Sequence, residues 1–238
     1  MNFFILVLVV CFFIFLYTVY LLSNDDFVIL RRDIPMERIF NIVFLTALVS
    51  LFFSRLFYVI FHPNNIFGSL LGFLLFPYFP GLSLSGGILG GVLFSVFYFK
   101  INNLPLGRLF DFFSIGFLVS YPLGFVGFLV LSKAEFSNVI IVSLVLIFLL
   151  SLCFIKYVLP ATLGGKLKDG TLGLLFLLSF SIISILINVL NKQSLRSDEL
   201  GGIKSIFDKE NILFFVIFIS ALIFLIKQEW KERLRSRQ

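Results

Sequence analysis

Long runs of apolar residues, separated by short polar or charged segments, occupy most of the chain. Seven of these runs approach or exceed the ~18 residues that mark a membrane-crossing helix. They cover residues 3–22, 40–61, 85–99, 110–131, 138–159, 171–190 and 211–227. The pattern predicts an all-α integral membrane protein with about seven transmembrane helices. We expect residues 1–238 to form a single transmembrane domain.

One further apolar segment is too short to cross a bilayer. Residues 66–76 number only eleven, and Pro77 and Pro80 follow them. An apolar stretch of this length is typical of a re-entrant or interfacial piece. The sequence therefore predicts such a segment near residues 66–80, between the second and third spans.

The distribution of Lys and Arg between the spans predicts the orientation in the membrane. Thirteen lie on the side of the first loop, the third loop, the fifth loop and the C-terminus, five lie on the other side, and Arg55 lies within a span. Because cytoplasmic loops carry the excess of basic residues, we expect the N-terminus outside and the C-terminus in the cytoplasm. Residues 192–210 are then an extracytoplasmic loop, and residues 228–238 are a basic cytoplasmic tail.

Composition excludes several classes of protein. The chain is 60% hydrophobic and only 13% charged, with a mean hydropathy of +1.10, which excludes a soluble domain. Its net charge of +6 lies in loops and at the C-terminus, so we expect no nucleic-acid partner. Cys11 and Cys153 lie in separate apolar runs with no CxxC spacing, and we interpret them as small hydrophobic residues. No metal and no cofactor is expected.

Glycine is concentrated where the third span begins. Residues 81–94 read GLSLSGGILGGVLF, and the fourth span carries a matching stripe of small residues at 116, 120 and 124. Small residues four apart let two helix backbones approach closely in lipid. One interpretation is that these two helices pack tightly against each other. The other is that the backbone at Gly86 and Gly87, with Ser83 and Ser85, is exposed to a ligand, because bare amides at a helix start attract phosphate.

Charged residues inside the predicted spans are functional candidates by default. Arg55 falls near the outer end of the second span, and the alternative is that its side chain snorkels to the interface. Asp111 opens the fourth span close to Arg108, and the alternative there is an acid that compensates the helix dipole. His62, the one histidine, lies in the loop just beyond Arg55, where a solvated side chain is the ordinary outcome.

Four short segments carry a resemblance to a known family. They are RLFYV at 55–59, GLS at 81–83, GGILGG at 86–91 and RLFD at 108–111, in this order. The pattern resembles the prolipoprotein diacylglyceryl transferases, bacterial inner-membrane enzymes with seven spans and an outside N-terminus. The motifs of that family include Arg-Leu-x-Tyr-Val, Gly-Leu-Ser-x-His-Gly-Gly and GRIGNFINGE. The resemblance extends over about residues 55–190.

The resemblance implies a reaction, its partners and a site. These enzymes move diacylglyceryl from phosphatidylglycerol to the thiol of the lipobox cysteine of a preprolipoprotein. Phosphatidylglycerol and a preprolipoprotein lipobox segment are therefore the expected partners, and the bacterial inner membrane is the expected location. The implied headgroup-binding residues are Arg55, Tyr58, Ser83, Ser85, Gly86 and Gly87, and the implied structural or supporting residues are Asp111, Gly124 and Gly127.

The chain departs from the family at positions that carry charge. The histidine before Gly-Gly, and the arginine, first asparagine and glutamate of GRIGNFINGE, fall on Ser85, Phe125, Phe128 and Lys133, while an arginine and a glutamate of the sixth span fall on Ser184 and Asn188. The transfer needs a base near the thiol and cations near the phosphate. Losing one preorganised donor typically lowers the rate by about 10²–10³-fold, so no catalytic residue is assigned.

Three functions remain open from the sequence. The first is a divergent transferase in which Arg55 holds the lipid and His62 or Tyr121 assists, although no motif places either of these two. The second is a catalytically inactive membrane protein that binds phospholipid or a lipoprotein partner. The third is a small transporter, suggested by the segment 66–76 and the glycine and proline breaks. No repeated half and no paired intramembrane acids support the transporter.

Overall fold

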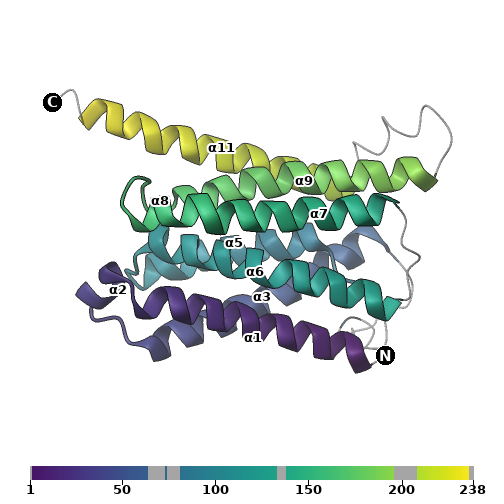
Figure 1. Cartoon of the computed structure of the whole chain (residues 1–238), viewed down its shortest axis with the longest axis horizontal. Helices are drawn as coiled ribbons and strands as arrows, with labels where there is room; N and C mark the ends of the chain where they lie inside the picture. Colours follow the sequence, from purple (N-terminus) through teal and green to yellow (C-terminus); the bar gives the residue numbers. More distant parts are fainter. Residues whose placement is uncertain (1, 64–72, 74–80, 133–137, 196–207, 236–238) are drawn as a thin grey trace. The chain divides into compact units, whose positions relative to one another are not determined.

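The computed structural model describes residues 2–63, 73, 81–132, 138–195 and 208–235, and every regular element in these residues is helical (Figure 1). This confirms the prediction of an all-α protein. The elements are α1 (Asn2–Asn24), α2 (Phe27–Arg31), α3 (Met36–Phe61), α5 (Leu84–Ile101), α6 (Leu106–Ser132), α7 (Asn138–Cys153), η2 (Phe154–Val158), α8 (Leu159–Leu163), α9 (Thr171–Leu195) and α11 (Lys209–Arg235).

Seven helices among the described residues are long and apolar enough to cross a membrane, as predicted. The protein is therefore a multi-pass membrane protein. The third predicted span, 85–99, is the helix Leu84–Ile101, and the fourth, 110–131, begins earlier, at Leu106 directly after Pro105. Proline ends the preceding turn and is favoured at helix starts. The predicted re-entrant segment 66–80 lies outside the described residues except for Phe73.

The fifth span is one apolar rod with a wider turn near its end. Helix α7 leads into η2, a π-helical turn, in which the amide of Leu159 donates to the carbonyl of Phe154. Pro160 follows in α8. Proline has no amide for the carbonyl four residues before it, and its ring crowds that turn. A wider π-turn accommodates this local conflict without ending the span.

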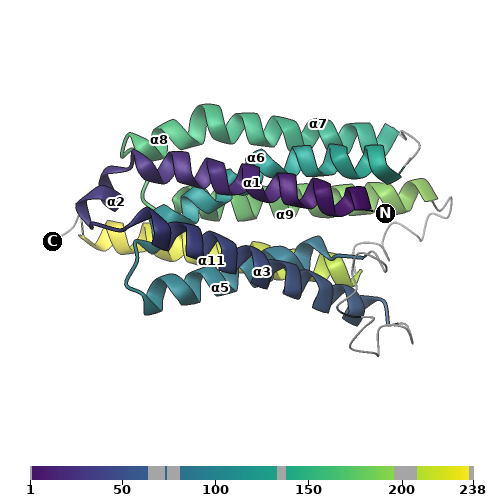
Figure 2. The same ribbon diagram turned by 90° about the horizontal axis from the view of Figure 1, so that it is seen from below.

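The chain forms two compact units, residues 1–137 and 138–238, and each is described by itself. The expectation of a single transmembrane domain stays a prediction. In unit 1, α1 packs along α6 and α3 packs along α5 (Figure 2). At the end near α2, these pairs share a core of buried apolar side chains that includes Val19, Ile42, Phe99 and Phe112.

The glycine stripes explain the pairing in unit 1. A Cβ atom on Gly86 would lie 2.6 Å from Cβ of Phe57 on α3, and one on Gly90 would lie 2.6 Å from Cγ of Phe53. On α6, a Cβ atom on Gly116 would lie 2.8 Å from Cδ2 of Phe15 on α1. The prediction that the stripes of the third and fourth spans pack against each other is therefore wrong. The glycines of α5 let α3 approach closely, and those of α6 let α1 approach closely. A stripe of small residues predicts that some helix packs closely there, but it does not identify which helix.

Unit 2 is centred on α9, which packs against both α7 and α11. Between α9 and α11 the side-chain amide of Asn188 donates to Oδ1 of Asn211 at 2.9 Å, and Asn211 is fully buried. Such a pair is typical of polar contacts that join helices in lipid. The predicted loop 192–210 begins inside α9, which reaches Leu195, and its residues 196–207 lie outside the described residues.

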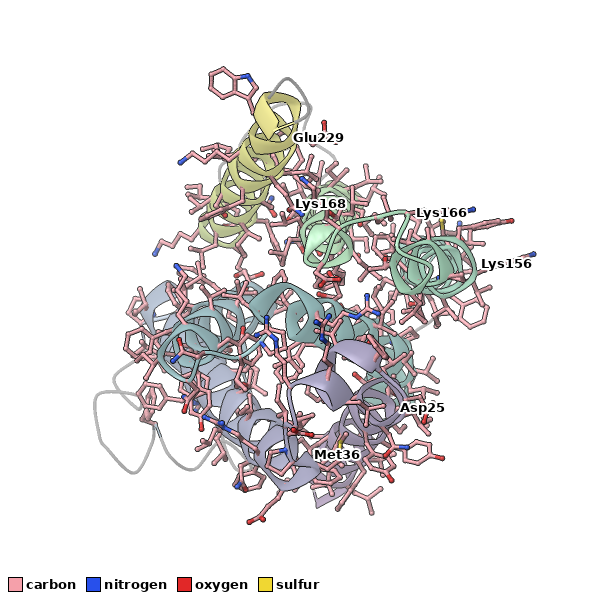
Figure 3. The ribbon with its side chains drawn as sticks, turned by 90° about the vertical axis from the view of Figure 1, so that its left-hand side faces the viewer. Asp25, Met36, Lys156, Lys166, Lys168 and Glu229 are labelled. Atoms are coloured by element: carbon pink, nitrogen blue, oxygen red, sulfur yellow. The ribbon has the colours of Figure 1, made fainter. Side chains whose placement is uncertain are left out.

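Within each unit, a basic side chain donates a hydrogen bond that joins two segments at one end of that unit's helices. In unit 1, Nη2 of Arg38 donates to Oδ1 of Asn102 at 2.9 Å, which joins the first turn of α3 to the turn after α5. In unit 2, Nζ of Lys168 donates to the carbonyl of Gln228 at 3.0 Å, which joins the loop after α8 to the end of α11. Within unit 1, Asp25 and Met36 are labelled in Figure 3 near the end at which α3 begins. The outside position of the N-terminus stays a prediction.

Candidate functional site

Arg55 lies in the last two turns of α3, and its side chain turns inward. It is 2% exposed. Its Nη1 donates to the carbonyl of Gly81 at 2.8 Å and its Nε donates to the carbonyl of Phe73 at 3.2 Å. The guanidinium is therefore held against the chain that leads into α5. This geometry argues against the snorkelling interpretation, which requires the group to extend toward water.

The start of α5 is built from buried serine hydroxyls. Ser83 is the N-cap, and its Oγ accepts the amide of Gly86 at 3.3 Å, which satisfies one of the free donors of the first turn. Its hydroxyl also lies 3.0 Å from that of Ser85, and both residues are fully buried. The sequence predicted these two serines at the helix start, and the structure brings them together there.

Two hydrogen bonds fix this helix start to α3. The amide of Ser83 donates to the carbonyl of Ser54 at 3.0 Å, and Oγ of Ser54 donates to the carbonyl of Ser83 at 2.8 Å. One turn earlier, Oγ of Ser50 donates to the carbonyl of Gly87 at 2.8 Å. Sequence reasoning missed Ser50 and Ser54. Their four-residue spacing, which matches that of the glycines, was the available signal.

Gly86 and Gly87 contribute close packing, because both of their amides have acceptors within the protein. The amide of Gly86 reaches Ser83 Oγ, and that of Gly87 donates to the carbonyl of Ser83 at 3.0 Å. The two preceding amides, of Leu84 and Ser85, have no acceptor among the described residues, as is usual in a first helical turn. These are the amides that an anion would meet at the helix start.

Tyr58 and Gly81 complete the surroundings of Arg55. Gly81 has φ +155°, and a Cβ atom there would overlap the Tyr58 ring, so glycine is required by both conformation and space. The Tyr58 ring lies 5.8 Å from the Arg55 guanidinium carbon and stacks on His62, with 4.8 Å between ring centroids. His62 therefore ends α3 against the ring of Tyr58, within this cluster.

The other sequence-predicted residues lie elsewhere. Asp111 is 1% exposed near the start of α6, at the opposite end of unit 1 from Arg55. A Cβ atom added to Gly124 would lie 3.0 Å from Sγ of Cys11, and one added to Gly127 would lie 2.6 Å from Cγ1 of Val7, so both glycines let α1 approach closely. Tyr121 stacks on Phe117 of the same helix, with 5.2 Å between ring centroids.

A buried ion pair that the sequence analysis did not predict lies at the opposite end of unit 1 from Arg55. Nε and Nη2 of Arg108 both approach Oδ2 of Asp26 at 2.7 Å, while Oδ1 of Asp26 accepts the amides of Val28 and Ile29. Asp26 is 3% exposed and Arg108 is 8% exposed. The pair ties α2 to α6, and we assign it a structural role.

Three of the residues that the sequence comparison aligns with charged positions of the family have ordinary packing contacts in the structure. Ser184 is 7% exposed on α9, and Asn188 pairs with Asn211. Phe125 lies next to Tyr121 in an aromatic row on α6, with 6.4 Å between centroids. Lys133 and the side chain of Phe128 lie outside the described part of the chain. Within that part, no three His, Cys, Asp or Glu residues come together to hold a metal ion.

The arrangement at the α3–α5 junction is chemically suited to an anion. Hydrogen bonds between α3 and the start of α5 bring a guanidinium, two hydroxyls and the positive end of a helix dipole to the same junction. Each favours negative charge. Ser85 itself offers no base for proton abstraction, because it carries a neutral hydroxyl that already contacts Ser83.

Comparison with known proteins adds one match. A family model described as prolipoprotein diacylglyceryl transferase matches residues 2–134, more than half of the chain and almost all of unit 1. No curated protein and no solved structure matches the chain.

Proposed function

The chain belongs to the prolipoprotein diacylglyceryl transferase family, and we propose that it is a divergent member that binds a phosphatidylglycerol headgroup where α3 meets α5. It is a transferase-like, multi-pass membrane protein. We place it in the bacterial inner membrane and associate it with lipoprotein modification. A preprolipoprotein lipobox segment is the second proposed partner.

One observation carries the headgroup proposal. The buried guanidinium of Arg55 donates to the carbonyl of Gly81, two residues before the serine that caps α5. A cation and a helix N-terminus therefore lie beside the same few residues, 81–83. Phosphate is attracted by both, since the guanidinium offers charge-assisted hydrogen bonds and the helix start offers amides and a dipole. Tyr58 and Ser85 border this region and are proposed to shape it.

The substituted positions set the expected chemistry. In the transfer, the cysteine sulfur bonds to the terminal glycerol carbon of the diacylglyceryl group, the carbon–oxygen bond to phosphate breaks, and the thiol gives up its proton. We propose that Arg55, held at the start of α5 by its hydrogen bond to Gly81, stabilises the glycerol phosphate that leaves. Ser85, Phe125 and Lys133 supply no base at the positions that match the family motifs. We therefore propose that transfer is slow, by about 10²–10³-fold for each lost donor.

A second candidate function follows from the same site. Ser85 is fully buried with its hydroxyl 3.0 Å from that of Ser83, an arrangement that serves the helix cap without any reaction. The site would then bind a phospholipid or the acylated end of a lipoprotein partner and release it unchanged. This alternative keeps the headgroup interactions and omits the thiol chemistry.

Diacylglyceryl transfer to a lipobox peptide, measured with the full chain in phosphatidylglycerol membranes, separates the two candidates. A family member with intact motifs serves as the positive control. Slow transfer that Arg55→Ala abolishes, and that the exposed-site control Lys100→Ala leaves unchanged, supports the divergent enzyme. Phosphatidylglycerol binding without transfer supports the binding protein. Transfer that is equally fast in the Arg55→Ala variant contradicts the proposed role of the guanidinium.

A further inference from the structure

Almost all of the net charge of the protein lies in unit 2, at one end of its helices. Unit 2 contains twelve Lys and Arg residues and seven Asp and Glu residues, so it carries +5 of the total +6. Residues 156–170 and 227–238 together hold eight of the basic residues and three of the acidic ones. Residues 191–210, which connect the last turn of α9 with the first turn of α11 along the chain, hold four of each and are neutral. Unit 2 is therefore electrically polarised along its helices.

Hydrogen bonds hold the two basic segments side by side. Nζ of Lys168 donates to the carbonyl of Gln228 at 3.0 Å, and Nε2 of Gln228 donates to Oγ1 of Thr171 at 3.1 Å. The loop before α9 therefore rests on the end of α11. Figure 3 shows Lys156, Lys166 and Lys168 together with Glu229 at this end of unit 2. Because the loop is fixed, its positive charges are presented without a large ordering cost.

Aromatic residues place this end at the level of lipid headgroups. Trp230 is 68% exposed, four residues after the apolar run of α11 stops at Ile226. Tyr157 is 64% exposed, and the Lys156 ammonium lies 5.5 Å from its ring centroid. Tryptophan and tyrosine beside Lys and Arg are typical of the membrane–water interface. Helix α11 nevertheless continues to Arg235, so it carries further basic residues past that level.

We propose that this basic rim, comprising Lys156, Lys166, Lys168 and residues 227–235 of α11, binds the anionic headgroups of phospholipids in the leaflet that it faces. Clusters of Lys and Arg directly after a transmembrane helix attract anionic lipids, and the attraction falls off within a Debye length. The rim lies in unit 2, whereas Arg55 lies in unit 1. It is therefore a second lipid-binding surface, and its test is independent of the transfer assay.

The single tryptophan of the chain, Trp230, reports on this surface directly. The full chain is placed in nanodiscs of zwitterionic phosphatidylcholine and anionic phosphatidylglycerol, with bromine on the acyl chains of one lipid or the other. If the rim gathers anionic lipid, Trp230 fluorescence is quenched about twofold more when phosphatidylglycerol carries the bromine. The difference disappears in about 1 M salt, where the Debye length is about 3 Å. Equal quenching by the two lipids at low salt overturns the proposal.

Two charge-matched variants and a soluble competitor assign the effect to the rim. The rim variant is Lys156→Gln, Lys166→Gln, Lys227→Gln and Lys231→Gln, and the control variant is Lys192→Gln, Arg196→Gln, Lys204→Gln and Lys209→Gln. Lys168 is kept because it holds the loop. The rim variant should lose the stronger quenching of Trp230 by brominated phosphatidylglycerol, and the control variant should keep it. If both variants lose it, the effect does not come from the rim. Glycerol phosphate at matched ionic strength should not compete, and competition would identify a soluble phosphate site instead.

Discussion

Ser54 and Ser83 are joined by two hydrogen bonds that run in opposite directions between α3 and α5. The amide of Ser83 reaches the carbonyl of Ser54 at 3.0 Å, and the hydroxyl of Ser54 reaches the carbonyl of Ser83 at 2.8 Å. Arg55 follows Ser54 directly, and its guanidinium bonds the carbonyl of Gly81. The position of the cation relative to the helix start is therefore set by main-chain contacts.

Removing the Ser54 hydroxyl should weaken this junction modestly. Ser54→Ala loses one interhelical hydrogen bond, but the Ser83 carbonyl keeps the amide of Gly87, so no acceptor is left bare. We expect a loss of about 0.5–1 kcal/mol in the free energy of unfolding. Ser95→Ala is the control, because the Ser95 hydroxyl bonds within its own helix. Equal losses in the two variants, measured by thermal unfolding in detergent, would contradict the account.

Two glycines on α5 should respond differently to alanine. A Cβ atom on Gly86 would lie 2.6 Å from Cβ of Phe57 and 3.0 Å from the carbonyl of Phe53, and a backbone atom cannot move aside. On Gly91 the nearest atom, Cβ of Ser50, would lie at 3.5 Å, an ordinary contact. Gly86→Ala should therefore destabilise the protein by about 1–3 kcal/mol.

Gly91→Ala should be neutral or stabilising, because alanine favours a helix over glycine by up to about 1 kcal/mol. Thermal unfolding of both variants in the same detergent makes the comparison. If Gly91→Ala destabilised as much as Gly86→Ala, the described packing of α5 on α3 would be incorrect.

The sequence predicted the spans well because lipid imposes a strong requirement on each helix separately. Any segment that crosses hydrocarbon must be long and apolar and must satisfy its own backbone. Local boundaries followed from local chemistry, as at Pro105 before α6 and at Ser83 before α5. The partner of each helix did not follow. Gly86 and Gly116 predict that another helix packs closely against them. Only the structure shows that the neighbouring residues are Phe57 of α3 and Phe15 of α1.

The buried ion pair of unit 1 gives a prediction about stability. Asp26→Asn keeps an acceptor for the α2 amides but leaves the Arg108 guanidinium without its carboxylate. Removing one partner of a buried pair typically costs about 3–5 kcal/mol. Asp25→Asn is the control and should change the free energy of unfolding little. Asp25 is exposed, and its described contact is the hydrogen bond that its carboxylate accepts from the Asn24 side chain.

Pairing Asp26→Asn with Arg108→Gln should recover part of the loss, because the Arg108 guanidinium is then no longer buried without the Asp26 carboxylate. Chemical denaturation of the single and double variants tests this. A double variant that is as unstable as the sum of the singles would show that the two side chains do not act as a pair.

This pair also shows why part of the structure was not predictable. Asp26 and Arg108 are 82 residues apart, and nothing in the local pattern links an acid in one loop to a base before another span. Arg55 was different, since a charge inside an apolar run is conspicuous by itself. Its acceptors, the carbonyls of Phe73 and Gly81, were not predictable, because a carbonyl carries no sequence signature.

The amide pair in unit 2 should show a small energetic coupling. Asn188 donates to Asn211 at 2.9 Å between α9 and α11. A double-mutant cycle with Asn188→Ala and Asn211→Ala should give a coupling of about 0.6 kcal/mol, the average for such contacts in membrane proteins. Ser179 bonds within its own helix, so a cycle between Ser179→Ala and Asn211→Ala should give none. A coupling of zero in the first cycle would contradict the described contact.

The measurement that tests the central claim most directly is the affinity of the Arg55 site for phosphatidylglycerol. It is made with native mass spectrometry in the rim-variant background, so that the basic rim contributes less to the measured binding. Arg55→Ala should weaken binding by about 10- to 100-fold, since a hydrogen bond to a charged group contributes about 1.5–3 kcal/mol.

Two further variants keep the test interpretable if Arg55→Ala disturbs the chain near Gly81. Arg55→Lys retains the charge and should recover part of the affinity, and Lys100→Ala should change nothing. If a folded Arg55→Ala protein binds phosphatidylglycerol as tightly as the parent, the headgroup does not lie at the α3–α5 junction and the account is contradicted.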